Sequence, residues 1–470
     1  RLVGAPPKSI GNYGGDTDNW MWPRHTGDFS IFRVYAGPDG KPAEYSPDNV
    51  PYRPQHHLPV SLEGVEEGDF AMIMGYPGNT DRFMTSYGIR ELKEISHPNR
   101  IHIRGKKLEI MKKIMNKSPE HRIMYASKYK GTSNYWKYSI GQMEGFKRID
   151  LLSKRKKLEK RFIEWINGHP QREDQYGQTM DLIQKAYESR SGYEHAGQYL
   201  RETMMYGPEI ISFARSTDDL KSLLDQPFIK RLFSRKEIKK EIEKLKQEGS
   251  RHFRDYHQPT DQEIAETLFA MFKEDIDPRF YPELFARSLE QYDGQVAEYV
   301  KDLYSTSIFT DKERFEAFLE DPDGEALEND PVYRLSNSVY DQYFHLRAMS
   351  SQYDNQLQKG QRLFVQGIRA MQSDQTFYPD ANFTMRLTYG QVGGYQARDA
   401  VRYKHYTTLK GVMEKEDPDN YEFIVPDKLK SLYQEKNYGR YGEDGYMPVC
   451  FITNNDITGG NSGSPVMNGK

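Results

Sequence analysis

The sequence of 470 residues contains a single cysteine, Cys450, so no disulfide can form within it. No apolar run reaches about 18 residues, which is the length that a membrane-spanning helix needs. Net charge is only −3, from 66 basic and 69 acidic side chains. This near balance indicates neither a nucleic-acid groove nor a surface for anionic membranes.

Motifs that bind metals or phosphates are also missing from the sequence. It has no His-Glu-x-x-His pair and no Cys/His cluster at zinc-binding spacing. The stretch "DPDGEALEND" resembles a calcium loop in composition, but its glycine stands at position four instead of six. No glycine-rich phosphate loop precedes a helix. We therefore predict no metal ion and no cofactor.

Aromatic residues, in contrast, are plentiful at 13%, with 34 tyrosines, which indicates a folded core under a charged surface. The length exceeds one ordinary domain, and the apolar periodicity changes twice along the chain. A helical period runs from about Tyr87 to about Gln375. Strand-like stretches lie on either side of it: "DFSIFRVYAGPDGKPAEY", "GDFAMIMGYPGNT", "NFTMRLTYGQVGGY" and "YMPVCFITNN".

The helical part carries local start signals. Ser234 with Glu237, and Thr260 with Glu263, have the spacing of a capping box. In "GQVAEYVKDLYS", residues 294–305, the apolar positions fall on one helix face. The order strand, helix, strand predicts an α+β protein in which one β domain is interrupted by a large all-α insertion. We place the parts at residues 1–86, 87–377 and 378–470.

A glycine-rich stretch, "NDITGGNSGSPVMNGK", follows the last apolar strand-like run. Glycines admit backbone conformations closed to other residues, and such a loop can turn its N–H groups inward to bind an anion. A serine at its centre, Ser462, would then lie beside an oxyanion site, as acyl transfer requires. The alternative is a Gly-Ser hairpin that only reverses the chain.

The string "GGNSGSP" resembles the nucleophile loop of chymotrypsin-fold serine peptidases. Over essentially its whole length, the sequence resembles the bacterial dipeptidyl-peptidase 7 and dipeptidyl-peptidase 11 family of serine exopeptidases. The stretches that carry the resemblance are "GGDTDNWMWPRHTGDFSIFRVYAG", "MGYPGNT", "GTSNYWK" and "NNDITGGNSGSPVMNGK". The resemblance implies a chymotrypsin-like double β-barrel interrupted by a helical lid domain. It implies Ser462 as nucleophile, with the N–H groups of Gly460 and Ser462 as oxyanion hole.

The resemblance assigns four further residues. Asp28 would orient the catalytic histidine, while Asn19, Trp20 and Asn134 would hold the free N-terminal amine of the substrate. Each has a structural alternative: Asp28 a turn residue, Trp20 a core residue and Asn134 a helix cap. Asparagine oxygens accept hydrogen bonds from an ammonium group and an indole face attracts a cation, so the residue types suit the role.

The family pattern also requires a histidine before Asp28. His25 lies only three residues ahead, in the "PRHTGD" turn, and His56-His57 comes later, ahead of an expected "LPVSL" strand. We therefore expect an internal piece of a longer protein, with the histidine upstream of Arg1 and further chain beyond Lys470. Alone, this piece would be inactive, because Ser462 has no base.

Two other functions stay open. One is a trypsin-like or HtrA-like serine endopeptidase, which shares the loop. The other is a catalytically incomplete, peptide-binding protein of the same fold. The family resemblance implies peptide substrates with a free N-terminus, a homodimer, and a periplasmic, cell-surface or secreted location. The preference for an acidic or a hydrophobic residue before the scissile bond is left open.

Overall fold

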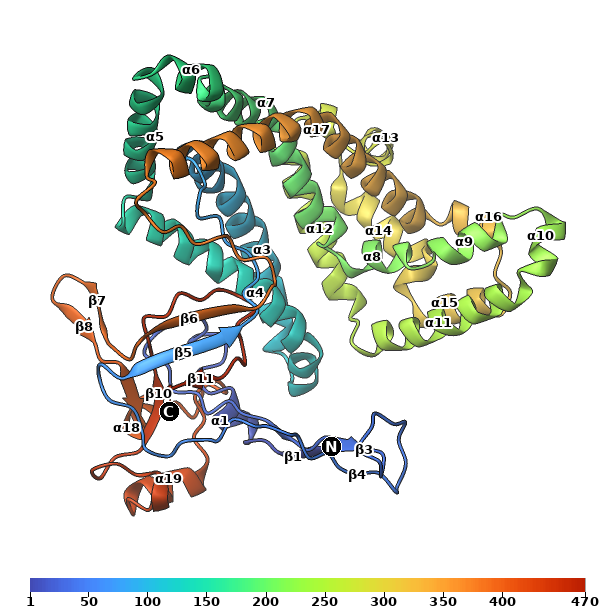
Figure 1. Cartoon of the computed structure of the whole chain (residues 1–470). Coiled ribbons are helices and arrows are strands. Elements are labelled where there is room, and N and C mark those ends of the chain that lie inside the picture. The colour runs from blue at the N-terminus through green and yellow to red at the C-terminus, as the bar shows by residue number, and fades with distance from the viewer. Residues whose placement is uncertain (470) are drawn as a thin grey trace. The chain divides into compact units, whose positions relative to one another are not determined.

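The computed structural model describes residues 1–469 (Figure 1). The chain divides into two compact units. The strand unit comprises Arg1–Arg82 and Tyr378–Lys470, and the helical unit comprises Phe83–Phe377. The boundaries placed from the sequence were 86/87 and 377/378, within a few residues of this division.

The helical unit consists of α-helices with a few short 3₁₀ and π turns (η). They are α2 (Ser86–Glu91), η1 (Leu92–Ser96), α3 (His97–Met115), α4 (Pro119–Arg148), α5 (Leu151–Asn167), α6 (Pro170–Tyr176), α7 (Thr179–Leu200), η2 (Arg201–Met205), α8 (Glu209–Arg215), α9 (Asp218–Leu224), α10 (Phe228–Phe233), α11 (Arg235–Arg254), α12 (Gln258–Asp275), η3 (Pro278–Phe280), α13 (Glu283–Gln291), α14 (Val296–Thr306), η4 (Ile308–Thr310), α15 (Lys312–Glu320), α16 (Gly324–Asn329) and α17 (Pro331–Met371).

The longest helix, α17, organises this unit. Its 41 residues span about 60 Å, and it packs along α7 (Figure 1). Apolar residues at helical spacing, among them Val332, Leu335 and Val339, are fully buried in a large core. Farther along α17, Phe364 packs edge-to-face on Phe162 in a second, smaller core. Because α7 and α17 contribute to both cores, they join them into one body.

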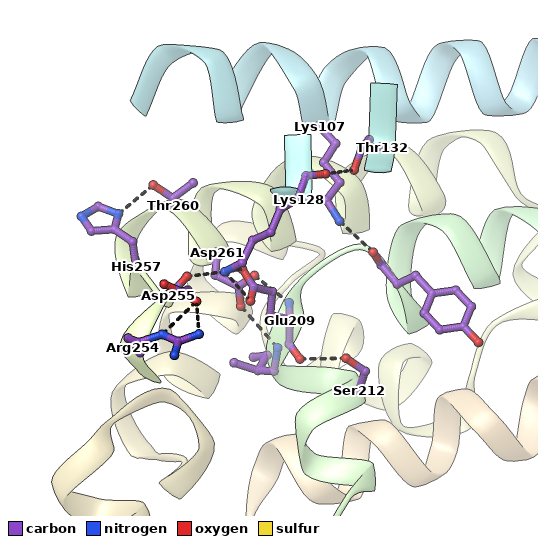
Figure 2. A network of polar contacts seen from close by, with 12 residues as sticks. Lys107, Lys128, Thr132, Glu209, Ser212, Arg254, Asp255, His257, Thr260 and Asp261 are labelled. Atoms are coloured by element: carbon purple, nitrogen blue, oxygen red, sulfur yellow. Dashed lines mark hydrogen bonds and ion pairs between the residues drawn. The ribbon is translucent and has the colours of Figure 1, made fainter. Parts of the chain in front are cut away.

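A buried polar network ties α8 to α12 in the larger core (Figure 2). The Asp261 carboxylate accepts hydrogen bonds from the Glu209 N–H at 2.7 Å and the Tyr304 hydroxyl at 2.7 Å. Lys128 Nζ donates to both Glu209 carboxylate oxygens at 2.7 Å. Burial, and then the nearby Glu209 charge, raise the pKa of Asp261 to about 7.

The predicted helix over residues 294–305 is confirmed as α14, but both predicted capping boxes are wrong. The Ser234 hydroxyl donates to Gln226 Oε1 instead of capping α11. Thr260 lies inside α12, and its hydroxyl pairs with the His257 ring. In both cases a nearby side chain satisfies the hydroxyl, so the sequence pattern alone did not fix the cap.

The strand unit holds short strands and a few short helices. They are β1 (Leu2–Gly4), α1 (Lys8–Gly11), β2 (Ile31–Phe32), β3 (Tyr35–Ala36), β4 (Val50–Pro51), β5 (Phe70–Gly75), β6 (Arg386–Gln391), β7 (Tyr395–Arg398), β8 (Val401–Tyr403), β9 (Tyr406–Thr408), α18 (Leu409–Glu414), α19 (Asp427–Gln434), η5 (Gly439–Tyr441), β10 (Pro448–Phe451) and β11 (Val466–Met467). Three of the four strand-like stretches predicted from sequence thus contain a strand of four to six residues: β5, β6 and β10.

All strand pairs within the described residues are antiparallel, but they form no closed barrel. One sheet has three strands in the order β11-β5-β6, and four sheets have two strands each. The predicted double barrel is therefore not observed in residues 1–469. The predicted strand from Asp28 onward is also wrong in extent, because it reduces to the two-residue strands β2 and β3. Their side chains are mostly exposed, so little burial extends the pairing.

Among the described helices, none combines the length and hydropathy needed to cross a membrane. No group of three or more His, Cys, Asp or Glu side chains in residues 1–469 is arranged to hold a metal ion. Two of the three aspartates in the calcium-like stretch cap helices instead. Asp323 accepts from two N–H groups at the start of α16, and Asp330 does the same for α17.

Candidate active site

The glycine-rich loop joins β10 to β11, at the sheet that contains the longest strands of the strand unit. β11 pairs antiparallel with β5, with Val466 opposite Ile73 and Met467 opposite Met72. β5 in turn pairs over its whole length with β6. The loop therefore enters the sheet beside the strand whose end carries the "GYPG" turn, residues 75–78.

The "GYPG" turn lies directly against the loop. The Gly78 N–H donates to the Gly459 carbonyl oxygen at 2.6 Å. Gly460 has a φ of 102°, a conformation that side-chain-bearing residues rarely adopt. A Cβ atom there would lie 2.4 Å from the Tyr76 carbonyl oxygen and 2.9 Å from the Gly78 nitrogen. Only glycine fits this position without displacing one of the two segments.

The centre of the loop presents Ser462 to solvent. The Asn461 N–H donates to Thr458 O at 3.3 Å, and the Ser464 N–H donates to Asn461 O at 2.9 Å. Within residues 1–469, no backbone hydrogen bond uses the N–H of Gly460 or of Ser462. An exposed hydroxyl is thus accompanied by two N–H groups that can donate to an anionic oxygen.

Asp28 belongs to the same unit and lies in an irregular segment just before β2. The two preceding residues anchor this segment. The Thr26 carbonyl accepts from Cys450 Sγ at 3.4 Å, and the Gly27 N–H donates to Ile10 O at 3.0 Å. Asp28 itself is exposed, and the structure records no hydrogen bond between it and a histidine of residues 1–469.

The two histidine candidates differ in environment. His25 is buried, and its ring lies where a side chain on Gly411 would stand. Burial, reinforced by the Lys415 charge, lowers the pKa of His25, which favours a neutral ring in the core. His56 and His57 are exposed, and the segment after them forms no strand in the described chain, contrary to the expectation for "LPVSL".

Asn19 and Trp20 lie on a tight turn that follows Tyr13. Trp20 is 57% exposed with a φ of 62°, so the alternative of a core residue is wrong. Asn19 is partly buried, and its N–H donates to the Asp16 carbonyl at 3.1 Å. Three residues that hold this turn were not found from the sequence: Asp18, Lys415 and Glu422.

Asn134 lies in the helical unit, in the middle of α4, and is exposed. It is therefore not a helix cap. Its neighbours fasten this part of α4 to α3: the Trp136 Nε1–H donates to the Ile101 carbonyl at 3.0 Å, and the Arg104 guanidinium lies 5.3 Å from the Tyr135 ring centre. The backbone that carries Asn134 is consequently well fixed.

Comparison with known proteins identifies the family. The profile of peptidase S46 matches residues 1–470. The chain belongs to the peptidase S46 family. It is 41% identical to "Dipeptidyl-peptidase 7" of Phocaeicola vulgatus and 40% identical to "Asp/Glu-specific dipeptidyl-peptidase" of Porphyromonas gingivalis, in both cases over 100% of this chain. This S46 chain spans 64% of the length of those two relatives.

Solved structures share the fold of this chain. The crystal structure of Porphyromonas endodontalis DPP11 in complex with dipeptide Arg-Glu matches with a TM-score of 0.88 and 40% identity. The match covers 100% of this chain and 66% of that one. The same protein in an alternate conformation matches with a TM-score of 0.72.

Proposed function

We propose that the protein is a serine dipeptidyl-peptidase that releases dipeptides from the free N-terminus of peptides. The observation that carries the proposal is the Ser462 loop, in which an exposed hydroxyl is flanked by two N–H groups without a backbone partner. The names of its S46 relatives support the same activity.

In the proposed reaction, Ser462 Oγ attacks the carbonyl carbon of the second substrate residue, and its proton passes to a histidine base oriented by Asp28. The N–H groups of Gly460 and Ser462 donate to the oxyanion that forms. The C–N bond then breaks, the leaving amine takes the proton, and the dipeptide remains as an ester on Ser462. Water cleaves that ester and restores the hydroxyl.

The strand unit is proposed to be part of a chymotrypsin-like double β-barrel. Two features support this view: all its strand pairs are antiparallel, and the serine loop leads directly into a strand. The relatives with acidic specificity and those named dipeptidyl-peptidase 7 are equally similar to this chain, so neither specificity is favoured.

A dipeptidyl-peptidase must bind a free amine two residues before the scissile bond. We assign this role to Asn19, Trp20 and Asn134. Two extended residues span about 7 Å, so within the strand unit Asn19 and Trp20 are proposed to act at about that distance from Ser462. A charge-assisted hydrogen bond from an ammonium group to an asparagine oxygen contributes roughly 1.5–3 kcal/mol.

The test compares a dipeptide substrate that has a free amine with its N-acetylated twin. The intact protein should cleave the free-amine substrate much faster. Asn19→Ala and Asn134→Ala should each lower kcat/KM for it about 10- to 150-fold, while the slow reaction of the acetylated twin changes little. Equal rates on both substrates in the wild type would favour the endopeptidase alternative.

A further inference from the structure

The turn that carries Asn19 and Trp20 is held by a carboxylate from a distant part of the chain. Glu422 Oε2 accepts from the Thr17 hydroxyl at 2.6 Å and from the Thr17 N–H at 3.4 Å, while Glu422 Oε1 accepts from the Asp16 N–H at 3.1 Å. The Glu422 residue is only 7% exposed. A buried carboxylate with three donors from one turn fixes that turn firmly.

The approach of Glu422 depends on a glycine. Gly15 has a φ of 45°, and a Cβ atom on it would lie 2.6 Å from the Glu422 side chain. Phe423, the next residue in the chain, packs edge-to-face on the buried Tyr13 ring, with 5.6 Å between the ring centres. The residue after Glu422 thus packs on the core of the strand unit, and the Glu422 side chain approaches the turn where Gly15 has no side chain.

A second contact holds the end of the turn. Lys415 Nζ donates to the buried Asp18 carboxylate at 2.9 Å and to the Pro23 carbonyl at 3.2 Å. Asp18 is therefore fixed on one side of Asn19, and Pro23 is fixed a few residues after Trp20. Both contacts come from a single side chain of the strand unit, so they act on the turn together.

Trp20 shows why such support is needed. Its φ of 62° is uncommon for a bulky residue, and its side chain is mostly exposed. A backbone of this kind persists only where the surrounding structure holds it, and it is typical of functional sites. The contacts of the turn with Glu422 and Lys415 supply that restraint.

We propose that Glu422, through Thr17, is a positioning residue that sets the geometry of the amine-binding turn. The inference rests on the proposed function, because it gives Asn19 and Trp20 the role assigned above. In the proposed role, Glu422 does not touch the substrate. It determines how well Asn19 and Trp20 meet the ammonium group, and thereby how strongly a free N-terminus is preferred.

The test uses Thr17, because its hydroxyl makes the shortest contact and can be removed with little change in volume. In the intact protein, Thr17→Val should raise KM for the free-amine substrate and lower its kcat/KM about tenfold, with little change in kcat. Thr17→Ser keeps the hydroxyl and should stay within about twofold of wild type. Glu422→Gln replaces one acceptor oxygen by a donor and should resemble Thr17→Val.

A matched control lies elsewhere in the same unit. Asp380 accepts from the Thr80 hydroxyl and the Arg82 N–H, both at 2.7 Å, so it makes the same kind of contact away from the turn. Asp380→Asn should destabilise the fold about as much as Glu422→Gln does. It should leave the ratio of kcat/KM for the free-amine substrate to kcat/KM for the acetylated substrate unchanged. Thermal unfolding of each variant confirms that it is folded.

The outcomes separate the inference from the proposed function. If the wild type prefers the free amine, Asn19→Ala loses that preference, and Thr17→Val and Glu422→Gln keep it, the positioning role is overturned. The role is also overturned if Thr17→Ser fails like Thr17→Val, or if Asp380→Asn lowers the ratio equally. A wild type without preference for a free amine refutes the proposed function itself.

Discussion

Gly460→Ala should disable the serine loop without unfolding the protein. The added Cβ would lie 2.4 Å from the Tyr76 carbonyl oxygen, whereas ordinary contacts begin at 3.4 Å, so one segment must move by about 1 Å. The φ of 102° adds backbone strain of about 1–3 kcal/mol for a residue other than glycine. Both effects act on the N–H group that we assign to the oxyanion hole.

The loss of one oxyanion donor costs about 10²- to 10³-fold in kcat, and a 1 Å displacement of reacting groups can cost about 10²-fold. We therefore expect kcat for a free-amine dipeptide substrate to fall by about 10²- to 10³-fold, with KM little changed. The assay is steady-state kinetics on the intact protein, with thermal unfolding measured in parallel.

Gly459→Ala is the matched control, because its φ is ordinary and no atom lies within 4 Å of the position that its Cβ would take. It should remain folded and within about threefold of wild-type kcat. If Gly460→Ala keeps more than about a tenth of wild-type kcat, or if Gly459→Ala loses as much activity, the loop does not supply the oxyanion hole in the way proposed.

Three further predictions concern Ser462, Asp28 and Asp261. Ser462→Ala should lower kcat by about 10⁶-fold, and Asp28→Asn should lower kcat by about 10⁴-fold. The unfolding temperature should be unchanged in both variants. Residual activity of a tenth or more in Ser462→Ala would exclude Ser462 as the nucleophile. Burial and Glu209 raise the pKa of Asp261 from 3.8 to about 7, so between these values the folded state binds a proton that the unfolded chain has released. This stabilising contribution is complete below about pH 4 and is lost as the pH rises through 7. In denaturant titrations, the free energy of unfolding of wild type relative to Asp261→Asn should therefore fall by about 2–3 kcal/mol between pH 5 and pH 8. A difference independent of pH would show that Asp261 does not carry the proton.

Apolar runs and helical periodicity in the sequence correctly predicted several strands and one helix. The apolar runs at β5, β6 and β10 and the helical face of α14 are each buried or paired where the periodicity indicated. The capping boxes failed because their hydroxyls found nearer side-chain partners, and pattern matching cannot weigh such competition. The prediction of a long strand after Asp28 was wrong, because alternation of apolar and polar residues does not guarantee a long partner strand.

The candidate site shows a similar division. The glycines around Ser462 are a local sequence signal, and the φ of 102° at Gly460 explains why glycine stands at that position. The role of Ser462 as nucleophile stays a prediction. The restraints on the Asn19–Trp20 turn were missed because Thr17 and Glu422 are 405 positions apart in the chain. No periodicity or motif near Glu422 indicates such a partner, and only the folded chain brings the two together.

The position at which the protein cuts a peptide tests the proposed function directly. The most direct measurement is mass spectrometry of the products that the intact protein makes from a ten-residue peptide and from the same peptide with an acetylated N-terminus. We predict a series of products shortened by two residues at a time from the free N-terminus, almost none from the acetylated peptide, and none from either with Ser462→Ala. Internal cleavage of the acetylated peptide, or products shortened by one residue, would contradict it.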